Sequence, residues 1–156
     1  SLMRAANAIA GLYPRIDRDL LLMGVFLHDL GKTEELCFDG EMTYTDAGQL
    51  LGHLVQGAID LDRRIALIRQ KSASEFPESL RLRLLHMIIS HHGQLEHGSP
   101  KVPMTIEAIV LAYLDDLDAK INQATELIAA DRNSDSAWTT FHPSLSRKLY
   151  KPSLGS

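Results

Sequence analysis

The sequence predicts an all-α fold, a bundle of about five to seven helices, on two observations. Apolar residues recur every three or four positions along five segments, which is the spacing that buries one face of a helix. Helix-capping residues, prolines and glycines separate these segments. With 156 residues, of which 45% are hydrophobic, the chain can bury one core, so we expect residues 1–156 to form a single domain.

The first two helices are expected at residues 1–12 and 17–30. The first ends before Pro14, which cannot continue a helix, and Asp17 is placed to cap the second. The chain starts inside a helical pattern without an initiator Met or a capping residue. We therefore interpret it as a fragment of a longer protein, cut within its first helix.

A loop and a long helix follow. Residues 31–47 are expected to form the loop, and within it residues 37–44 suit a short hairpin around Asp39 and Gly40. Asp46 is then placed to cap a helix that runs to about residue 70, and residues 72–76 form a polar link.

Two more helices complete the expected fold. Pro77 suits the first turn of a helix that ends near His92, and Thr105 starts a helix that runs to about residue 131. Residues 93–104 form a loop, and the tail from Asn133 gives no clear structural signal.

Composition excludes several classes of protein. The net charge of −4 gives no basic footprint for nucleic acid or membrane surfaces, which weakens any claim of tight, non-specific nucleic-acid binding by this segment alone. The single cysteine, Cys37, excludes an internal disulfide and a thiolate-rich zinc cluster, and it suits a reducing cytoplasm. No apolar run is long enough to span a membrane, and we expect no signal peptide. We therefore expect a cytoplasmic domain without membrane contact.

One segment places metal-ligand side chains at the end of an apolar helix. Residues 20–27 are apolar apart from Gly24, so this part of the second helix should be buried on every side. His28 and Asp29 close it, and Gly31 and Lys32 follow. A buried carboxylate without a partner is costly, and an adjacent imidazole and carboxylate are ligands that a divalent metal takes.

Ligand-type residues also fall on apolar faces of three other helices. His91 extends the core-facing stripe of its helix, and His92 points about a quarter-turn away. Asp115 lies on a stretch that is apolar on nearly all sides, so we expect it to be buried. His53 lies at the flank of an apolar stripe, and Gly57, one turn on, leaves room beside its ring.

Each residue alone has a structural explanation, because a lone core-facing histidine usually bonds a backbone carbonyl and His53 could be a surface residue. Together they favour a catalytic site for Mn, Fe, Mg or Zn, since histidine and carboxylate without thiolate suit these ions. Asp29 could bridge two metals, which is an arrangement that supports phosphoryl transfer. One metal would be held by His28 and Asp115, the other by His53 and His91.

The ordered series of these residues resembles the HD superfamily of metal-dependent phosphohydrolases. Residues 27–36, 44–58 and 90–120, with Trp138 and residues 147–150 of the tail, are similar to the HD domain of YhaM-type 3′-5′ exoribonucleases. The resemblance covers nearly the whole chain. It implies an all-helical HD-domain bundle that hydrolyses RNA or single-stranded DNA from the 3′ end with Mn²⁺ or a similar ion (Mg²⁺, Fe²⁺, Co²⁺ or Zn²⁺), one or two per site.

The resemblance also implies roles for individual residues. The core metal ligands would be His28, Asp29 and Asp115. A second metal would be held by His53 and by His91, His92 or both. Lys32, which alone would read as a helix-end cation, would hold a phosphate oxygen, and Asp29 and Lys32 would be the catalytic residues.

Two features of the family are expected outside this sequence. The first histidine of the superfamily would fall just upstream of Ser1, and an N-terminal OB-type domain would supply most of the grip on RNA. Two rival functions remain open at this point. One is an HD enzyme that acts on free nucleotides or cyclic nucleotides, and the other is a non-catalytic, metal-poor HD module used for partner or nucleotide binding. The sequence leaves the oligomeric state open.

Overall fold

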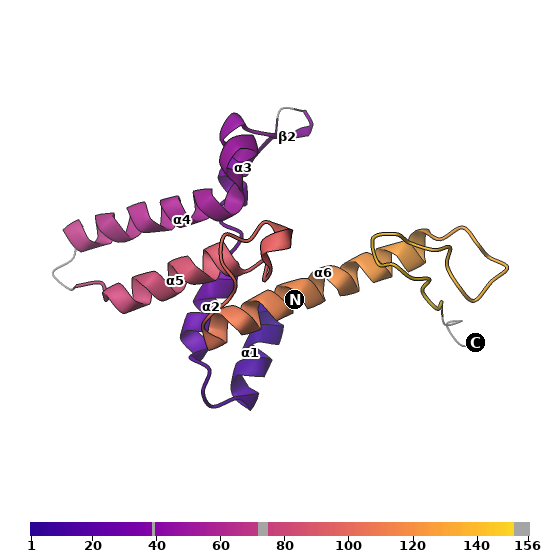
Figure 1. Cartoon of the computed structure of the whole chain (residues 1–156), viewed down its shortest axis with the longest axis horizontal. Coiled ribbons are helices and arrows are strands. Elements are labelled where there is room, and N and C mark those ends of the chain that lie inside the picture. The colour runs from indigo at the N-terminus through magenta and orange to yellow at the C-terminus, as the bar shows by residue number, and fades with distance from the viewer. Residues whose placement is uncertain (39, 72–74, 152–156) are drawn as a thin grey trace. The chain divides into compact units, whose positions relative to one another are not determined.

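The computed structural model describes residues 1–38, 40–71 and 75–151, and over these residues helices dominate (Figure 1). The expected all-α fold is confirmed, with one two-stranded hairpin added. The chain divides into two compact units, Ser1–Asp116 and Leu117–Ser156, which we call unit 1 and unit 2. The single domain expected over residues 1–156 stays a prediction. Every candidate site residue lies in unit 1.

The first two helices form as expected, with one earlier end. Helix α1 spans Leu2–Leu12 and α2 spans Arg18–Leu27. The Asp17 side chain caps α2 by accepting a hydrogen bond from the Leu20 N–H at 3.1 Å. Helix α2 ends at Leu27 rather than at residue 30, because the backbone bonds that follow link residues three apart, as in the 3.0 Å bond from Leu30 N–H to the Leu27 carbonyl.

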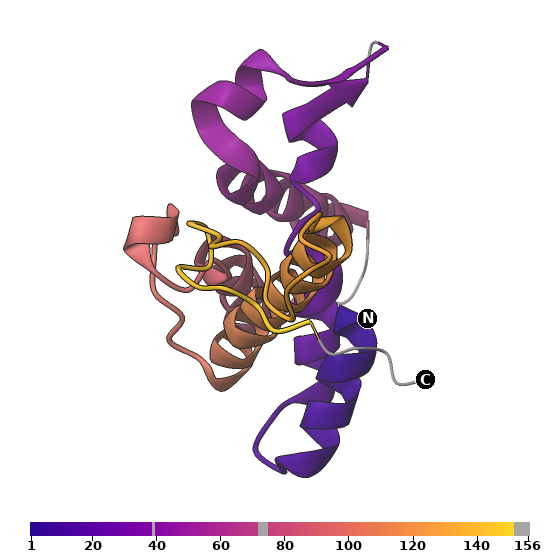
Figure 2. The ribbon, with the colours of Figure 1, turned by 90° about the vertical axis from the view of Figure 1, so that its right-hand side faces the viewer.

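The expected loop at residues 31–47 contains regular structure. A single-turn helix, α3, spans Lys32–Glu35, and the antiparallel strands β1 (Leu36–Phe38) and β2 (Met42–Tyr44) follow it. Pairing of Cys37 with Thr43 confirms the hairpin, although Asp39 of its turn lies outside the described residues. The hairpin lies beside α3 and the start of α4 at one end of unit 1 (Figures 1 and 2).

The long helix α4 spans Asp46–Lys71 and carries a break that the periodicity did not predict. At Gly52 the backbone has φ 69° and ψ 160°, a non-helical conformation that favours glycine. The cap was also assigned wrongly. Asp46 is the first helical residue, and the Thr45 hydroxyl accepts the Gly48 N–H at 2.8 Å in its place.

The remaining helices match their expected extents. Helix α5 spans Glu78–Ser90, a 3₁₀ turn η1 spans Leu95–His97, and α6 spans Ile106–Ala130. Pro77 stands at the N-cap of α5 rather than within its first turn. The polar link at residues 72–76 lies partly outside the described residues.

Unit 2 contains the end of α6 and a tail held by its own bonds. Thr139 donates its N–H to the Leu149 carbonyl at 2.9 Å, and its hydroxyl accepts the Leu149 N–H at the same distance. The rings of Trp138 and Tyr150 pack edge to face, with centroids 5.2 Å apart. The tail therefore has the order that its sequence did not reveal.

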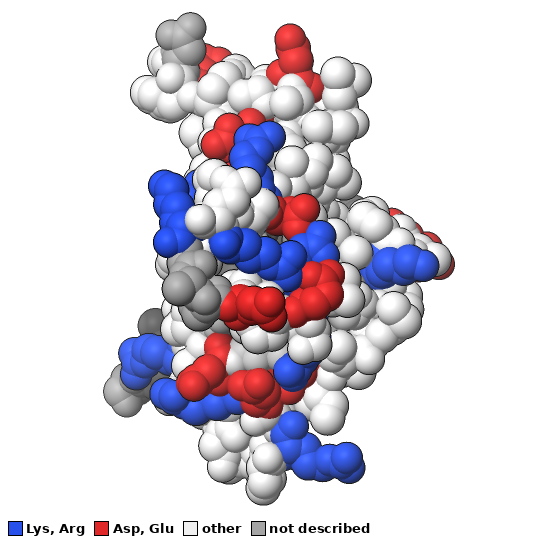
Figure 3. Space-filling view, turned by 90° about the vertical axis from the view of Figure 1, so that its left-hand side faces the viewer, with Lys and Arg blue, Asp and Glu red and all other residues white. Residues whose placement is uncertain are grey.

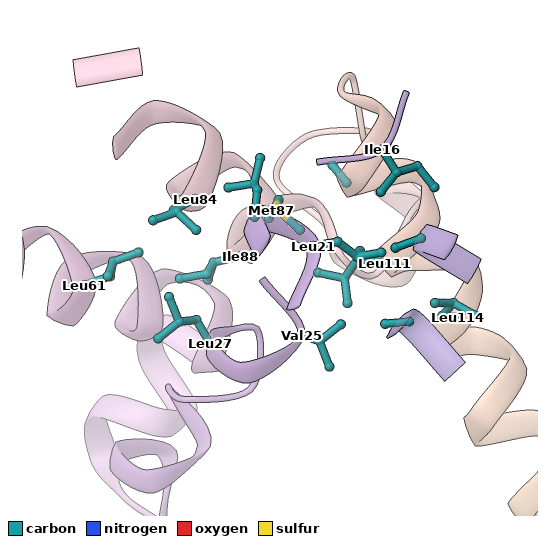
Figure 4. Close-up of a cluster of buried hydrophobic side chains, with 14 of the residues drawn as sticks. Ile16, Leu21, Val25, Leu27, Leu61, Leu84, Met87, Ile88, Leu111 and Leu114 are labelled. Carbon is teal, nitrogen blue, oxygen red and sulfur yellow. The ribbon is translucent and has the colours of Figure 1, made fainter. Parts of the chain in front are cut away.

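The core of unit 1 gathers apolar side chains from α1, α2, α4, α5 and α6 (Figure 4). Leu21, Met87, Ile88 and Leu111 are fully buried at its centre. Helices α4 and α5 lie side by side (Figure 1), and α2 packs against α5 where the Met87 side chain fills the space beside Gly24. This packing fixes the helix ends that carry the candidate site.

Acidic and basic side chains alternate on the face shown in Figure 3. Ion pairs on α4 and α5 include Arg69 with Glu78 at 2.7 Å and Arg81 with Asp62 at 2.5 Å. This face therefore has no continuous basic surface. Within the described residues, no helix is both long enough and apolar enough to cross a membrane.

Candidate metal centre

The structure brings six of the predicted site residues together from four helices of unit 1. His28 and Asp29 follow the end of α2, His53 lies just after the break in α4, and His91 and His92 follow α5. Asp115 lies on α6. Imidazole Nε2 atoms lie 3.3–3.8 Å from carboxylate oxygens, and imidazole ring centres lie 4.6–5.7 Å apart.

The Asp29 carboxylate stands between two groups of side chains. Its Oδ2 atom lies 3.3 Å from His28 Nε2 and 2.7 Å from Lys32 Nζ. Its Oδ1 atom lies 3.7 Å from His53 Nε2 and 3.8 Å from His91 Nε2. On the first side, Asp115 Oδ1 lies 3.6 Å from His28 Nε2. The two oxygens of one carboxylate thus face two different sets of potential ligands.

Backbone carbonyls orient three of the four histidines. His28 Nδ1 lies 2.7 Å from the Val25 carbonyl, His91 Nδ1 lies 2.7 Å from the Ile88 carbonyl, and His92 Nδ1 lies 3.0 Å from the His97 carbonyl. Because a carbonyl only accepts, each Nδ1 carries the proton, and Nε2 is the nitrogen left for another partner. A hydrogen bond to a backbone carbonyl would be a sufficient structural role for any one of these histidines alone. The same bond also orients the ring so that Nε2 can act as a metal ligand.

Buried atoms at the centre lack hydrogen-bond partners. Asp29 Oδ1 and His53 Nε2 are both inaccessible and unpaired, which is costly unless another group binds them. His53, His91 and His92 each offer a ligand atom, and these atoms lie within 4.8 Å of one another. Nitrogen and oxygen ligands sit about 2.0–2.2 Å from a zinc-like ion, so ligands of one ion lie about 3–4 Å apart. The donor set therefore fits a divalent metal.

Electrostatic interactions link His28 with the carboxylates of Asp29 and Asp115. Burial disfavours a charged His28, but hydrogen bonds from its ring to Asp115 and Asp29 outweigh burial and raise the pKa of His28 to about 9. Burial alone would raise the pKa of Asp29 and of Asp115. Hydrogen bonding to His28 reverses this and lowers the pKa of both carboxyl groups, with Lys32 adding to the effect at Asp29.

His91 behaves differently from His28. Its side chain is only 1% exposed, and burial lowers its pKa to about 4. A neutral imidazole is the form that binds a metal. The centre thus combines His28, whose raised pKa favours the protonated ring, with His91, whose lowered pKa favours the neutral ring.

Two expectations about burial need correction. Asp29 and Asp115 were expected to be buried, yet their side chains are 37% and 33% exposed. Asp29 follows the end of α2 and Asp115 lies within α6, and water reaches part of both carboxylates. The room left by the missing side chain of Gly57 is bordered by the backbone of Gly31 and by Ile88, and none of the three nearest atoms belongs to the His53 ring.

The structure adds one residue that sequence reasoning missed. Glu35 of α3 accepts a hydrogen bond from the His53 N–H at 3.1 Å, and its Oε2 lies 3.2 Å from His53 Nδ1. Glu35 and His53 are 18 positions apart, so no local sequence pattern connects them. Predicting their contact would have required recognising α3 as a helix.

The helical fold and the His–Asp cluster define a metal-binding domain of the HD type. The chain belongs to the HD domain family, whose sequence model matches residues 2–120. It is 40% identical over 154 residues to the 3′-5′ exoribonuclease YhaM of Bacillus subtilis (strain 168), a match that covers 99% of this chain and 47% of the relative. The YhaM proteins of Bacillus velezensis and Bacillus licheniformis are 42% and 41% identical, covering 99% and 97% of this chain and 47% and 46% of the relatives.

The chain spans about half the length of these curated relatives. No solved structure matches it significantly.

Proposed function

We propose that this chain is the catalytic HD domain of a metal-dependent 3′-5′ exoribonuclease. Its membership of the HD family and its identity to proteins named for that activity support the proposal. The observation that carries it is the Asp29 carboxylate, which presents Oδ2 to His28 and Oδ1 to His53 and His91. A carboxylate shared between two ligand sets is suited to bridging a pair of metal ions, an arrangement that supports phosphoryl transfer.

The proposal assigns the ligands to two positions. His28, Asp115 and Asp29 Oδ2 would hold one ion. His53, His91, His92 and Asp29 Oδ1 would hold the other. Ligands limited to imidazole and carboxylate support Mn²⁺ as the ion, as the sequence resemblance suggests. When bound, such ions would supply a Lewis acid for phosphoryl oxygens and a route to a nucleophile at neutral pH.

The residues of the chain itself would orient and bind. The Nδ1 hydrogen bonds hold the imidazole rings so that little rearrangement is needed when a ligand arrives. Lys32 Nζ, half-exposed and 2.7 Å from Asp29, places a cation at the edge of the centre. We assign Lys32 to a phosphate oxygen of the substrate, because an ammonium binds phosphate as a point charge.

RNA would be held chiefly outside this chain. The net charge is −4, and both signs of charge alternate on the face in Figure 3, so electrostatic attraction for a polyanion is weak. The relatives are about twice as long as this chain, and we propose that the further part, an OB-type domain by resemblance, grips the RNA. The cytoplasmic location expected from the composition stays a prediction.

The test of this function uses Asp29→Ala with Asp19→Ala as the matched control. Asp19 lies at the start of α2, the helix that Asp29 follows, and its side chain is 91% exposed and forms a surface ion pair with Arg18. In the presence of Mn²⁺, Asp29→Ala should lower the hydrolysis of a chromogenic phosphodiester by about 100-fold or more, since it removes ligands from both ions. Asp19→Ala should retain the wild-type rate, and circular dichroism should show that both variants fold.

The direction of digestion is tested on RNA labelled at its 5′ end, using the longer protein that contains this domain. A 3′-5′ exonuclease shortens the labelled strand progressively, whereas an endonuclease leaves scattered fragments. Hydrolysis of free or cyclic nucleotides without any shortening of RNA would point to the rival nucleotide hydrolase. An Asp29→Ala protein that still cuts would refute the assignment of the centre.

A further inference from the structure

Glu35 lies at the end of α3 with a side chain that is only 12% exposed. One of its oxygens, Oε1, accepts the His53 backbone N–H at 3.1 Å. The other, Oε2, lies 3.2 Å from Nδ1 of the same histidine. A single buried carboxylate thus holds both the backbone and the ring of one residue of the candidate centre.

The backbone bond compensates for the break in α4. Helical hydrogen bonding is interrupted at Gly52, so the segment that restarts at His53 has a helix N-terminus with N–H groups that lack helical partners. The Glu35 carboxylate accepts one of these N–H groups and places negative charge at the positive end of the helix dipole. Glu35 therefore caps the second segment of α4.

The ring bond fixes a tautomer. An ionised carboxylate only accepts hydrogen bonds, so His53 Nδ1 carries the proton in this contact. Nε2 is then the nitrogen with a lone pair, and it lies buried, without a partner, 3.7 Å from Asp29 Oδ1. Among the four histidines of the centre, His53 is the one whose Nδ1 faces a carboxylate rather than a carbonyl.

The backbone of Glu35 is itself held on both sides. Its carbonyl accepts the Thr45 N–H at 2.9 Å, and Gly48 packs directly against that carbonyl. At the other end of α3, Gly31 packs against the His53 carbonyl. The two ends of α3 therefore contact His53, Gly31 at its carbonyl and Glu35 at its N–H. These contacts restrict movement of the Glu35 side chain.

We propose that Glu35 is the positioning residue for His53, which it holds in the Nδ1–H tautomer with Nε2 directed at the metal centre. The inference rests on the proposed metal-binding function for the identity of the ligand. Its structural part, the tautomer and the cap, holds for the metal-free chain. Carboxylates behind ligating histidines fix the ring and raise the basicity of the other nitrogen, and losing such a partner costs about 10- to 100-fold in metal affinity.

The first experiment reads the tautomer without metal. Long-range ¹H–¹⁵N NMR of the metal-free full chain should show His53 as the Nδ1–H tautomer. In Glu35→Ala the ring should move towards the Nε2–H form that free imidazole side chains favour, while Glu35→Gln should keep most of the wild-type pattern because its amide oxygen still accepts. A His53 ring that carries its proton on Nε2 in the wild type, or that is unchanged in Glu35→Ala, would overturn the inference.

The second experiment measures Mn²⁺ binding by calorimetry in a double-mutant cycle. Glu35→Ala should weaken Mn²⁺ binding by about 10- to 100-fold, and the same change made in a His53→Ala background should have no further effect. Loss of stability from the missing cap should persist in both backgrounds, because His53→Ala keeps the backbone N–H. An equal loss of affinity in both backgrounds would mean that Glu35 is only structural.

Thr45→Ala is the matched control for general loosening of α4. It removes a hydroxyl that accepts the Gly48 N–H at 2.8 Å and donates to the Glu34 carbonyl at 2.8 Å and to the Glu35 carbonyl at 3.4 Å, while the Glu35 side chain that contacts the His53 ring is kept. It should lower stability and keep Mn²⁺ affinity near the wild-type value. If the wild type and His53→Ala bind Mn²⁺ equally, the proposed metal function fails at this position, whereas the tautomer result still decides the role of Glu35.

Discussion

At the residue scale, the two oxygens of Asp29 have different surroundings. Asp29 Oδ1 is buried without a partner, whereas Oδ2 of the same group meets both His28 and Lys32. Sequence reasoning found the residue types correctly, because a His–Asp pair at the end of an apolar helix is conspicuous. It overestimated the burial of Asp29 and Asp115, because periodicity describes the faces of one helix and says nothing of how fully the neighbouring helices cover them.

The pKa of His28 leads to a prediction about stability and pH. Its value of about 9 lies above the ordinary 6.5, so the folded chain binds this proton more tightly than the unfolded chain. The resulting stabilisation is fully present below about pH 6.5 and is lost as the pH rises through about 9. Urea unfolding of the metal-free chain should therefore show a falling free energy of unfolding across this window.

The matched variants for this prediction are His28→Gln and His97→Gln. His28→Gln should flatten the decline with pH, because the titrating group is gone. His97 is exposed, and its replacement should leave the decline unchanged. If both variants follow the wild-type curve, the interaction of His28 with Asp29 and Asp115 does not contribute to stability.

At the scale of elements, long helices were predictable and short ones were not. Helices α1, α5 and α6 follow apolar periodicity over 11 to 25 residues, which gives enough repeats for the pattern to be recognised. Helix α3 has four residues and no buried one, so it has no pattern to read. The break at Gly52 was hidden for a similar reason, because an isolated glycine is common within helices. Glu35 could not be assigned without both features.

Close packing of α3 on α4 predicts that Gly31→Ala is strongly destabilising. A Cβ at this position would overlap the His53 carbonyl and the Gly57 amide, which are backbone atoms that cannot rotate away. Its helical φ of −62° adds no strain, so the whole effect is steric. We expect a loss of at least about 2–3 kcal/mol in the free energy of unfolding, measured by urea titration.

Gly11→Ala is the matched control for this change. It makes the same substitution on α1, where nothing lies within 4 Å of the added carbon. We expect an unchanged or higher stability, by up to about 1 kcal/mol, since alanine restricts the unfolded chain. Similar stabilities for the two variants would show that α3 does not press on α4 as closely as described.

At the scale of the whole chain, the centre links four helices that are distant in sequence. His28, His53, His91 and Asp115 are contributed by α2, α4, α5 and α6 or the residues that follow them. Ions held by these residues would bind the folded chain and not the unfolded one. Binding should therefore raise the stability of unit 1 as a unit.

We expect Mn²⁺ to raise the melting temperature in a concentration-dependent manner. At about 100 times the dissociation constant, the gain of about 2.7 kcal/mol corresponds to roughly 5–10 °C for a chain of this size. Differential scanning fluorimetry with Mn²⁺, and again after addition of EDTA, measures the shift and its reversal. An Asp29→Ala chain should show little response. A wild-type melting temperature that stays constant up to millimolar Mn²⁺ would contradict the proposed centre.

The hydrogen bonds of His28 and His91 have a consequence for protein engineering. Each ring bonds a carbonyl three residues earlier in its own chain, so its direction is encoded in a segment of four residues at a helix end. Residues 25–28 could therefore be grafted onto the end of an unrelated helix. The grafted histidine should keep the ring orientation that its bond to the carbonyl three residues earlier imposes. The direction of His53 depends on Glu35 across 18 positions and would not survive the same transplant.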